Sequence, residues 1–191
     1  MTSPRDFGLL ALRLGIGGTL VAHGTQKLFG WFGGAGLEKT AAGFERIGFR
    51  PGKVNAIAAG LGEAGGGALL ATGIGSPGAG AAVAGTMIVA SSMHLDNGFF
   101  SSNGGFEFPG VLGLSAAALA LTGPGTLSID HVLGHRLNQP WMRSLALAAV
   151  APAAFAVIAR RRRAVAAAAA DIGTPAEPEA PAAALDDGQP A

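Results

Sequence analysis

The chain contains no cysteine among its 191 residues. This absence excludes disulfides, thiolate nucleophiles, iron–sulfur clusters held by cysteine and dithiol relays. A redox role would therefore run through a bound cofactor, a metal held by histidine and carboxylate, or a partner protein.

Charge is also scarce. Only 13% of the residues are charged, against about 25% in a typical soluble domain, and the mean hydropathy is +0.42. Such a chain cannot cover a soluble surface with charge, so we expect a multi-pass protein of the cell (inner or plasma) membrane with the lipid bilayer as its main partner. The net charge of +1 gives no indication of a nucleic-acid partner.

Long apolar runs make up most of the chain. They cover residues 7–29, 54–74, 78–95, 109–123 and 141–159. A spanning helix needs about 20 apolar residues; the fourth run is short, and the fifth is rich in alanine with Pro152 near its middle. The sequence "GIGSPG" at 73–78 predicts a tight turn that makes the second and third runs an antiparallel hairpin. We therefore predict an all-α integral membrane four-helix bundle with a fifth transmembrane helix.

Three segments follow from this pattern. Residues 1–130 form the four-helix membrane bundle, and residues 131–163 form a linker and the fifth transmembrane helix with a basic end. Residues 164–191 contain mainly alanine, proline and acidic residues without an apolar periodicity, so we expect this tail to be disordered.

The basic residues predict the orientation. One cluster lies in and around the first loop, and a second, Arg160–Arg163, follows the fifth run. The members of the first cluster are Lys27, Lys39, Arg46, Arg50 and Lys53. If both clusters are cytoplasmic, an even number of spans must separate them, which agrees with five spans and an N-terminus outside.

Glycine is abundant, with 32 residues. Small residues let helix backbones approach closely in lipid. Compositional bias of the genome is an alternative explanation.

Ionisable side chains gather at one level of the predicted bundle. His23 and Lys27 lie four residues apart at the end of the first span, and Glu63 lies in the second. His94 ends the third span and Glu107 opens the fourth. Antiparallel connectivity places these groups on one side, and we predict that His23, Glu63, His94 and Glu107 converge in one pocket.

The stretch "SMHLDNGFFSSNGGFEF" at 92–108 connects the third and fourth spans, and we interpret it as a lid over that pocket. Asn97 is a candidate ligand-binding residue within it, although Asn-Gly sequences are also typical of turns. Its phenylalanines either supply a stacking wall or anchor the chain at the membrane interface. These residues are Phe99, Phe100, Phe106 and Phe108.

Each candidate also has a purely structural interpretation. Glu63 could be neutral or paired with Arg13 of the first span, because a charged residue in mid-membrane is costly. His23 and His94 could cap helix ends, and Lys27 could extend its ammonium to the interface. His131 and His135 have helical spacing but no third ligand, so we predict no metal site there and expect a surface or interfacial loop helix.

Four segments of the sequence resemble the bacterial DoxX family of membrane proteins. They are RLGIGGTLVAHGTQKLFGWFGGAGL, GLGEAGGGALLATGI, MHLDNGFFSSNGGFEFP and LALTGPGTLSID, within about residues 7–130. The family's core is drawn with four membrane helices, so the fifth run, the basic end and the tail lie outside the resemblance.

The resemblance implies a redox-associated function. The family takes its name from a subunit associated with thiosulfate:quinone oxidoreductase, and mycobacterial relatives are linked to a membrane complex with superoxide dismutase and a sulfurtransferase. It points to a subunit that binds a quinone or similar molecule in a His/Glu pocket, with redox proteins as partners. The alternatives are a structural or assembly subunit without its own chemistry, and a small-solute transporter. Carried over by motif, the positions of interest are His23, Lys27, Glu63, His94 and Glu107.

Overall fold

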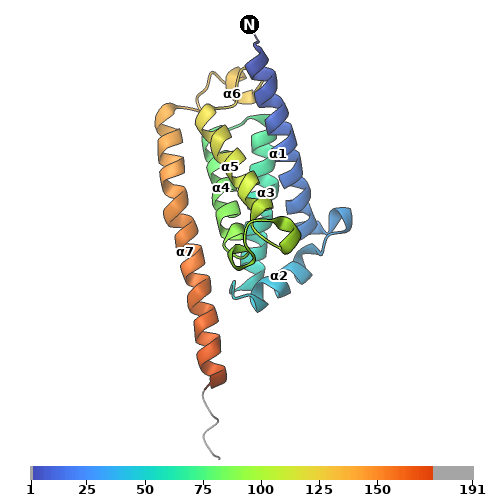
Figure 1. Cartoon of the computed structure of the whole chain (residues 1–191). Coiled ribbons are helices and arrows are strands. Elements are labelled where there is room, and N and C mark those ends of the chain that lie inside the picture. Colours follow the sequence, from blue (N-terminus) through green and yellow to red (C-terminus); the bar gives the residue numbers. More distant parts are fainter. Residues whose placement is uncertain (1, 174–191) are drawn as a thin grey trace, which may run out of the picture.

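The computed structural model describes residues 2–173, and within this range it contains helices and no strand. Four helices form a bundle, a fifth lies along its side, and two shorter helices occupy its ends (Figure 1). The helices are α1 (Pro4–Phe29), α2 (Gly36–Arg46), α3 (Gly52–Thr72), α4 (Ser76–Ser91), α5 (Glu107–Thr122), α6 (Ile129–Val132) and α7 (Pro140–Gly173). The prediction of an all-α membrane-type fold is confirmed, and a helix coincides with each of the five apolar runs.

The bundle is built from α1, α3, α4 and α5. Helix α3 packs against α1 and α4, α4 also packs against α5, and α7 packs mainly against α4. The core is small and aliphatic, and Leu20, Leu70, Val83 and Ala116 are fully buried in it. Large side chains such as Phe155 and Leu114 instead point outward, at 70% and 73% exposure, as expected for surfaces that face lipid.

Three helices of the described chain are long and apolar enough to cross a membrane: Pro4–Phe29, Gly52–Thr72 and Pro140–Asp171. Helix α5 is apolar but shorter. The tight turn predicted between the second and third spans is present, because α3 ends at Gly73 in the left-handed conformation (φ 69°) and α4 begins at Ser76.

Glycines bring α1 and α3 unusually close together. A Cβ atom added at Gly17 would collide with the backbone of Gly67, and one added at Gly24 would collide with the backbone of Ala64. By contrast, a Cβ at Gly18 would meet nothing within 4 Å. At these positions of α1, glycine is therefore required for packing, as close helix approach in lipid demands.

Buried polar contacts stabilise the end of the bundle at which α1 begins. Asp130 is fully buried and accepts hydrogen bonds from the amides of Gly75 (2.9 Å) and Ser76 (3.1 Å). Arg13, only 1% exposed, donates to the carbonyl of Leu127. The segment before α7 is thus held against α1 and the α3–α4 turn.

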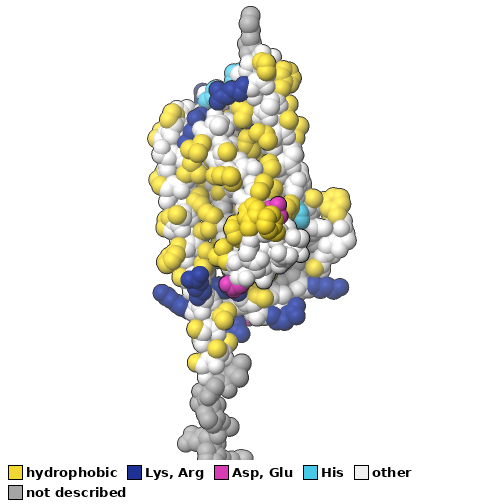
Figure 2. All heavy atoms as spheres, in the orientation of Figure 1, with side chains coloured by type: hydrophobic (Ala, Val, Ile, Leu, Met, Phe, Trp, Pro, Cys, Tyr) yellow, Lys and Arg dark blue, Asp and Glu magenta, His cyan; other side chains and the backbone are white. Residues whose placement is uncertain are grey.

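At the opposite end, α7 contacts the segment that joins α2 to α3. The Arg161 Nε donates to the Ile47 carbonyl at 2.9 Å, and its guanidinium lies 5.6 Å from the centre of the Phe49 ring. This contact brings the two basic clusters of the sequence to one end of the molecule, where Figure 2 shows lysine and arginine side chains gathered.

Helix α7 extends further than expected. Residues 164–173, which we predicted as part of a disordered tail, continue the helix to Gly173. The physical reason is the run of alanines, since alanine has the highest helix propensity of all residues. The remaining part of that prediction, residues 174–191, lies outside the described residues. Helix α2, within the first loop, was not predicted.

Candidate functional site

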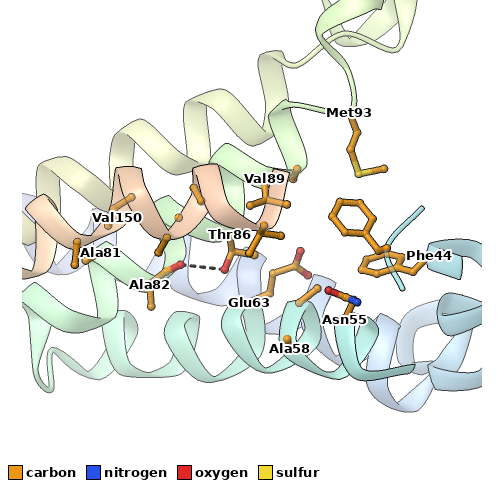
Figure 3. A pocket seen from close by; sticks show the side chains of 18 of the residues that line it. Phe44, Asn55, Ala58, Glu63, Ala81, Ala82, Thr86, Val89, Met93 and Val150 are labelled. Carbon is orange, nitrogen blue, oxygen red and sulfur yellow. Dashed lines mark hydrogen bonds between the residues drawn. The ribbon is translucent and has the colours of Figure 1, made fainter. Parts of the chain in front are cut away.

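A cavity of 690 Å³ lies between α3, α4 and α7 and is closed at one end by α2. Helices α4 and α7 contribute small apolar side chains, among them Ala82, Ala149 and Ala153. Lys27, Asn55, Glu63 and His94 supply ionisable or amide groups to the same lining. Figure 3 shows Glu63 and Asn55 projecting from α3 into the space beneath α4. The cavity is therefore largely apolar with a few polar groups among its lining.

An ion pair joins two of these polar residues. The Nζ atom of Lys27 on α1 lies 2.6 Å from Oε2 of Glu63 on α3, and the two side chains are 26% and 7% exposed. The close approach at Gly24, one turn before Lys27, lets the lysine reach across to α3. Both groups also line the cavity, so the pair is accessible to a molecule bound there.

The alternative interpretation that paired Glu63 with Arg13 is wrong. Arg13 lies at the other end of the bundle, at the Leu127 carbonyl, where Asp130 is its charged neighbour. Fourteen positions separate Arg13 from Lys27, which is about 21 Å along a helix at 1.5 Å per residue. Lys27 therefore pairs with Glu63 instead of only extending toward the interface.

His94 lines the cavity and is held by the 92–108 connection. Its Nδ1 lies 2.8 Å from the carbonyl oxygen of Gly104, and the amide of Asn97 donates to the same oxygen at 3.2 Å. A carbonyl can only accept, so Nδ1 of His94 carries the hydrogen. In the neutral ring, Nε2 is then free to accept a hydrogen bond or a proton. Asn97 itself stabilises the connection and is not among the lining residues.

His23 and Glu107 are not brought into this cavity. His23 packs against the ring of Phe108, with 5.2 Å between ring centres. Glu107 accepts from the backbone amide of Ser101 at 2.9 Å. The expectation that four side chains converge in one pocket is therefore corrected. Glu63 and His94 share the cavity, whereas Glu107 accepts a hydrogen bond from the backbone of the neighbouring turn.

The aromatic residues at the cavity also differ from those predicted. Phe99 packs edge-on against Phe100 and Phe106, so these rings stabilise the connection itself. The cavity is instead lined by Phe44 and Phe49, whose ring centres lie 5.5 Å apart. Sequence reasoning missed them because it treated the first loop as irregular; the amphipathic pattern of GLEKTAAGFER was the available signal.

Asn55 and the α7 wall were also missed. Asn55 lies two turns before Glu63 on α3, on the same face at i and i+8. The α7 residues recur at helical spacing along one face, as Ala146, Ala149, Val150, Ala153, Ala154 and Val157. That spacing could have indicated that these residues share one face of α7, although it does not indicate that this face lines a cavity.

His131 and His135 form a local pair at the other end, with 3.1 Å between Nδ1 and Nε2. No group of three or more metal-ligating side chains occurs among the residues that the structure describes.

Apolar helices, a lipid-facing exterior and a glycine-packed bundle define a multi-pass α-helical membrane protein. Residues 8–95 match the family model described as DoxX, which extends from within α1 to just beyond α4. The resemblance to DoxX found in the sequence is thus confirmed over this part of the chain. Comparisons with curated proteins and with solved structures gave no match.

Proposed function

We propose that the chain is a redox-associated membrane subunit that binds a quinone, or a similar flat amphiphile, in the cavity between α3, α4 and α7. The observation that carries this proposal is the Lys27–Glu63 ion pair, which is exposed to a cavity whose lining is otherwise mostly apolar. Sites for membrane-soluble ligands combine apolar walls with a small number of polar groups that fix the orientation of the ligand.

The residues present fit such a molecule. Phe44 and Phe49 offer ring faces for a flat head group, and the small side chains of α4 and α7 leave room for an apolar chain. Lys27 can donate a hydrogen bond to a ligand oxygen, and Asn55 can donate or accept one. A polar head group near the ion pair and a chain along the alanine-rich wall would therefore match the cavity.

Proton movement is the chemistry that these side chains can perform. A quinone, when bound, supplies a couple that takes up two electrons and two protons. The Glu63 carboxylate and the free Nε2 of His94 can each accept one proton, which is the role of a general base. The electrons are assigned to a partner redox protein.

The proposal is tested by binding a short-chain quinone to the purified protein in detergent. The variant Lys27→Met should weaken binding by about tenfold or more, since it removes a charged donor to a quinone oxygen, a contact worth about 1.5–3 kcal/mol. Glu63→Gln should also weaken binding, because the ammonium of Lys27 loses the carboxylate that positions it. Glu38→Gln is the matched control, because Glu38 is exposed and pairs with Lys53 away from the cavity lining. Equal quinone affinity in all variants would overturn the proposal.

A structural role is the second candidate. The ion pair links α1 to α3 at 2.6 Å, so each charge already has a partner without any ligand. In that case the same variants should lower the stability of the bundle, and mass spectrometry of the protein purified from native membrane should find no co-purifying quinone.

A further inference from the structure

We infer that the arginines at the end of α7 and at the end of α2 form one binding surface for the head groups of anionic phospholipids. This surface, the arginine end, consists of Arg46, Arg160, Arg162 and Arg163. It is separate from the cavity, and the inference does not depend on the proposed function.

The first support is the contact that joins the two segments. Arg161 donates to the carbonyl of Ile47, the residue directly after Arg46, and stacks on Phe49. Arg161 therefore makes its contacts within the protein, and these contacts position the arginine end. Its neighbours Arg160 and Arg162 point away at about 100° to either side of the helix.

The second support is the state of the remaining arginines. Arg46, Arg160, Arg162 and Arg163 are exposed, and within residues 2–173 none of them forms an ion pair. Two acidic residues at this end are already engaged, since Glu45 pairs with Arg50 and Glu38 pairs with Lys53. The arginine end thus carries positive charge that the described chain does not neutralise.

The third support is where the surface lies. The apolar window of α7 has a mean hydropathy of 1.8 and only 6% of it is buried inside the protein, so this helix faces lipid along most of its length. Arg160–Arg163 follow that apolar stretch directly, at the level where the head groups begin. This position favours a phospholipid over a phosphate from solution.

The chemistry of arginine suits this ligand. A guanidinium presents a planar fork of donors that binds two phosphate oxygens at once, and it remains charged at every physiological pH. Basic clusters next to a membrane helix attract anionic lipids, with a gain of about fivefold in affinity for each basic residue.

The test uses the full chain in a non-ionic detergent. Phosphatidylglycerol, phosphatidylcholine or inorganic phosphate is added, and bound molecules are counted by native mass spectrometry. We expect wild type to bind phosphatidylglycerol in preference to phosphatidylcholine. The double variant R160Q/R162Q should lose about 25-fold in affinity for it, from about fivefold per arginine, and 0.5 M salt should weaken the binding of wild type.

The matched control is R5Q/R136Q. Arg5 and Arg136 are also exposed, and the control removes the same charge at the opposite end. Its affinity for phosphatidylglycerol should equal that of wild type. The inference is overturned if both double variants lose affinity equally, if phosphatidylcholine binds as well as phosphatidylglycerol, or if inorganic phosphate displaces the lipid at equal concentration. Size-exclusion chromatography establishes that each variant is folded before the lipid is added.

Discussion

Lys27 and Glu63 lie 36 positions apart in the sequence, yet their charged atoms approach to 2.6 Å across the α1–α3 interface. Glu63 is nearly buried, whereas Lys27 retains a quarter of its side-chain exposure. The pair is therefore both a connection between two helices and the most polar feature of the cavity.

Removing one member of this pair should destabilise the bundle. Glu63→Leu leaves the ammonium of Lys27 without its partner, and breaking a buried pair in this way costs about 3–5 kcal/mol. Glu63→Gln should be milder because the amide oxygen still accepts a hydrogen bond. The double variant Lys27→Met/Glu63→Leu should regain most of the loss. Thermal unfolding in detergent measures all three, and equal melting temperatures for wild type and both single variants would show that the pair is incidental.

Two adjacent glycines of α1 should respond to alanine in opposite directions. Gly17→Ala places a methyl group against the backbone of Gly67 and should destabilise by about 1–3 kcal/mol through overpacking. Gly18→Ala meets nothing within 4 Å and should stabilise by about 0.5–1 kcal/mol, because alanine favours the helix. The two melting temperatures should therefore fall on either side of wild type. A gain from both substitutions would contradict the close packing of α1 on α3.

Asp130 should be essential for the order of the segment before α7. Asp130→Ala leaves the amides of Gly75 and Ser76 without an acceptor and should cost about 1–3 kcal/mol. Asp130→Asn keeps one acceptor oxygen and should cost less. Asp96→Ala is the control, since Asp96 is exposed in the 92–108 connection. Hydrogen exchange of residues 123–139 reports the effect, and unchanged protection in Asp130→Ala would refute this role.

Helix α7 should crosslink to α4. A Cβ atom added at Gly85 lies 3.7 Å from Cγ1 of Val150, so Gly85→Cys/Val150→Cys should form a disulfide on mild oxidation. The natural chain has no cysteine, and a crosslink can therefore only come from the introduced pair. Gly85→Cys/Phe155→Cys should not form one, because Phe155 points outward at 70% exposure. Crosslinking of both pairs, or of neither, would argue against this packing of α7.

Cysteines introduced into the two basic clusters should be modified only from the cytoplasmic side. In right-side-out membrane vesicles, an impermeant maleimide should modify Thr2→Cys but not Arg46→Cys or Arg162→Cys, because basic residues favour the cytoplasm. All three positions are exposed in the structure. Labelling of Arg46→Cys and Arg162→Cys from different sides would mean that α7 does not run beside the bundle as described.

The sequence predicted five of the helices because each coincides with an apolar run, and most of these runs are bounded by glycine or proline. It predicted that Glu63 and His94 lie at one level, since antiparallel connectivity decides that. It could not predict which basic residue reaches Glu63, because the choice between Arg13 and Lys27 depends on the register of α1 against α3, which the glycine contacts set. Likewise, the sequence gave no indication that Glu107 accepts a hydrogen bond from the backbone amide of Ser101.

The family model ends at residue 95, whereas one wall of the cavity belongs to α7, which begins at Pro140. The ion pair therefore lies within the matched region, whereas α7 lies outside it. A change confined to α7 would reshape one wall of the cavity and leave Lys27 and Glu63 in place.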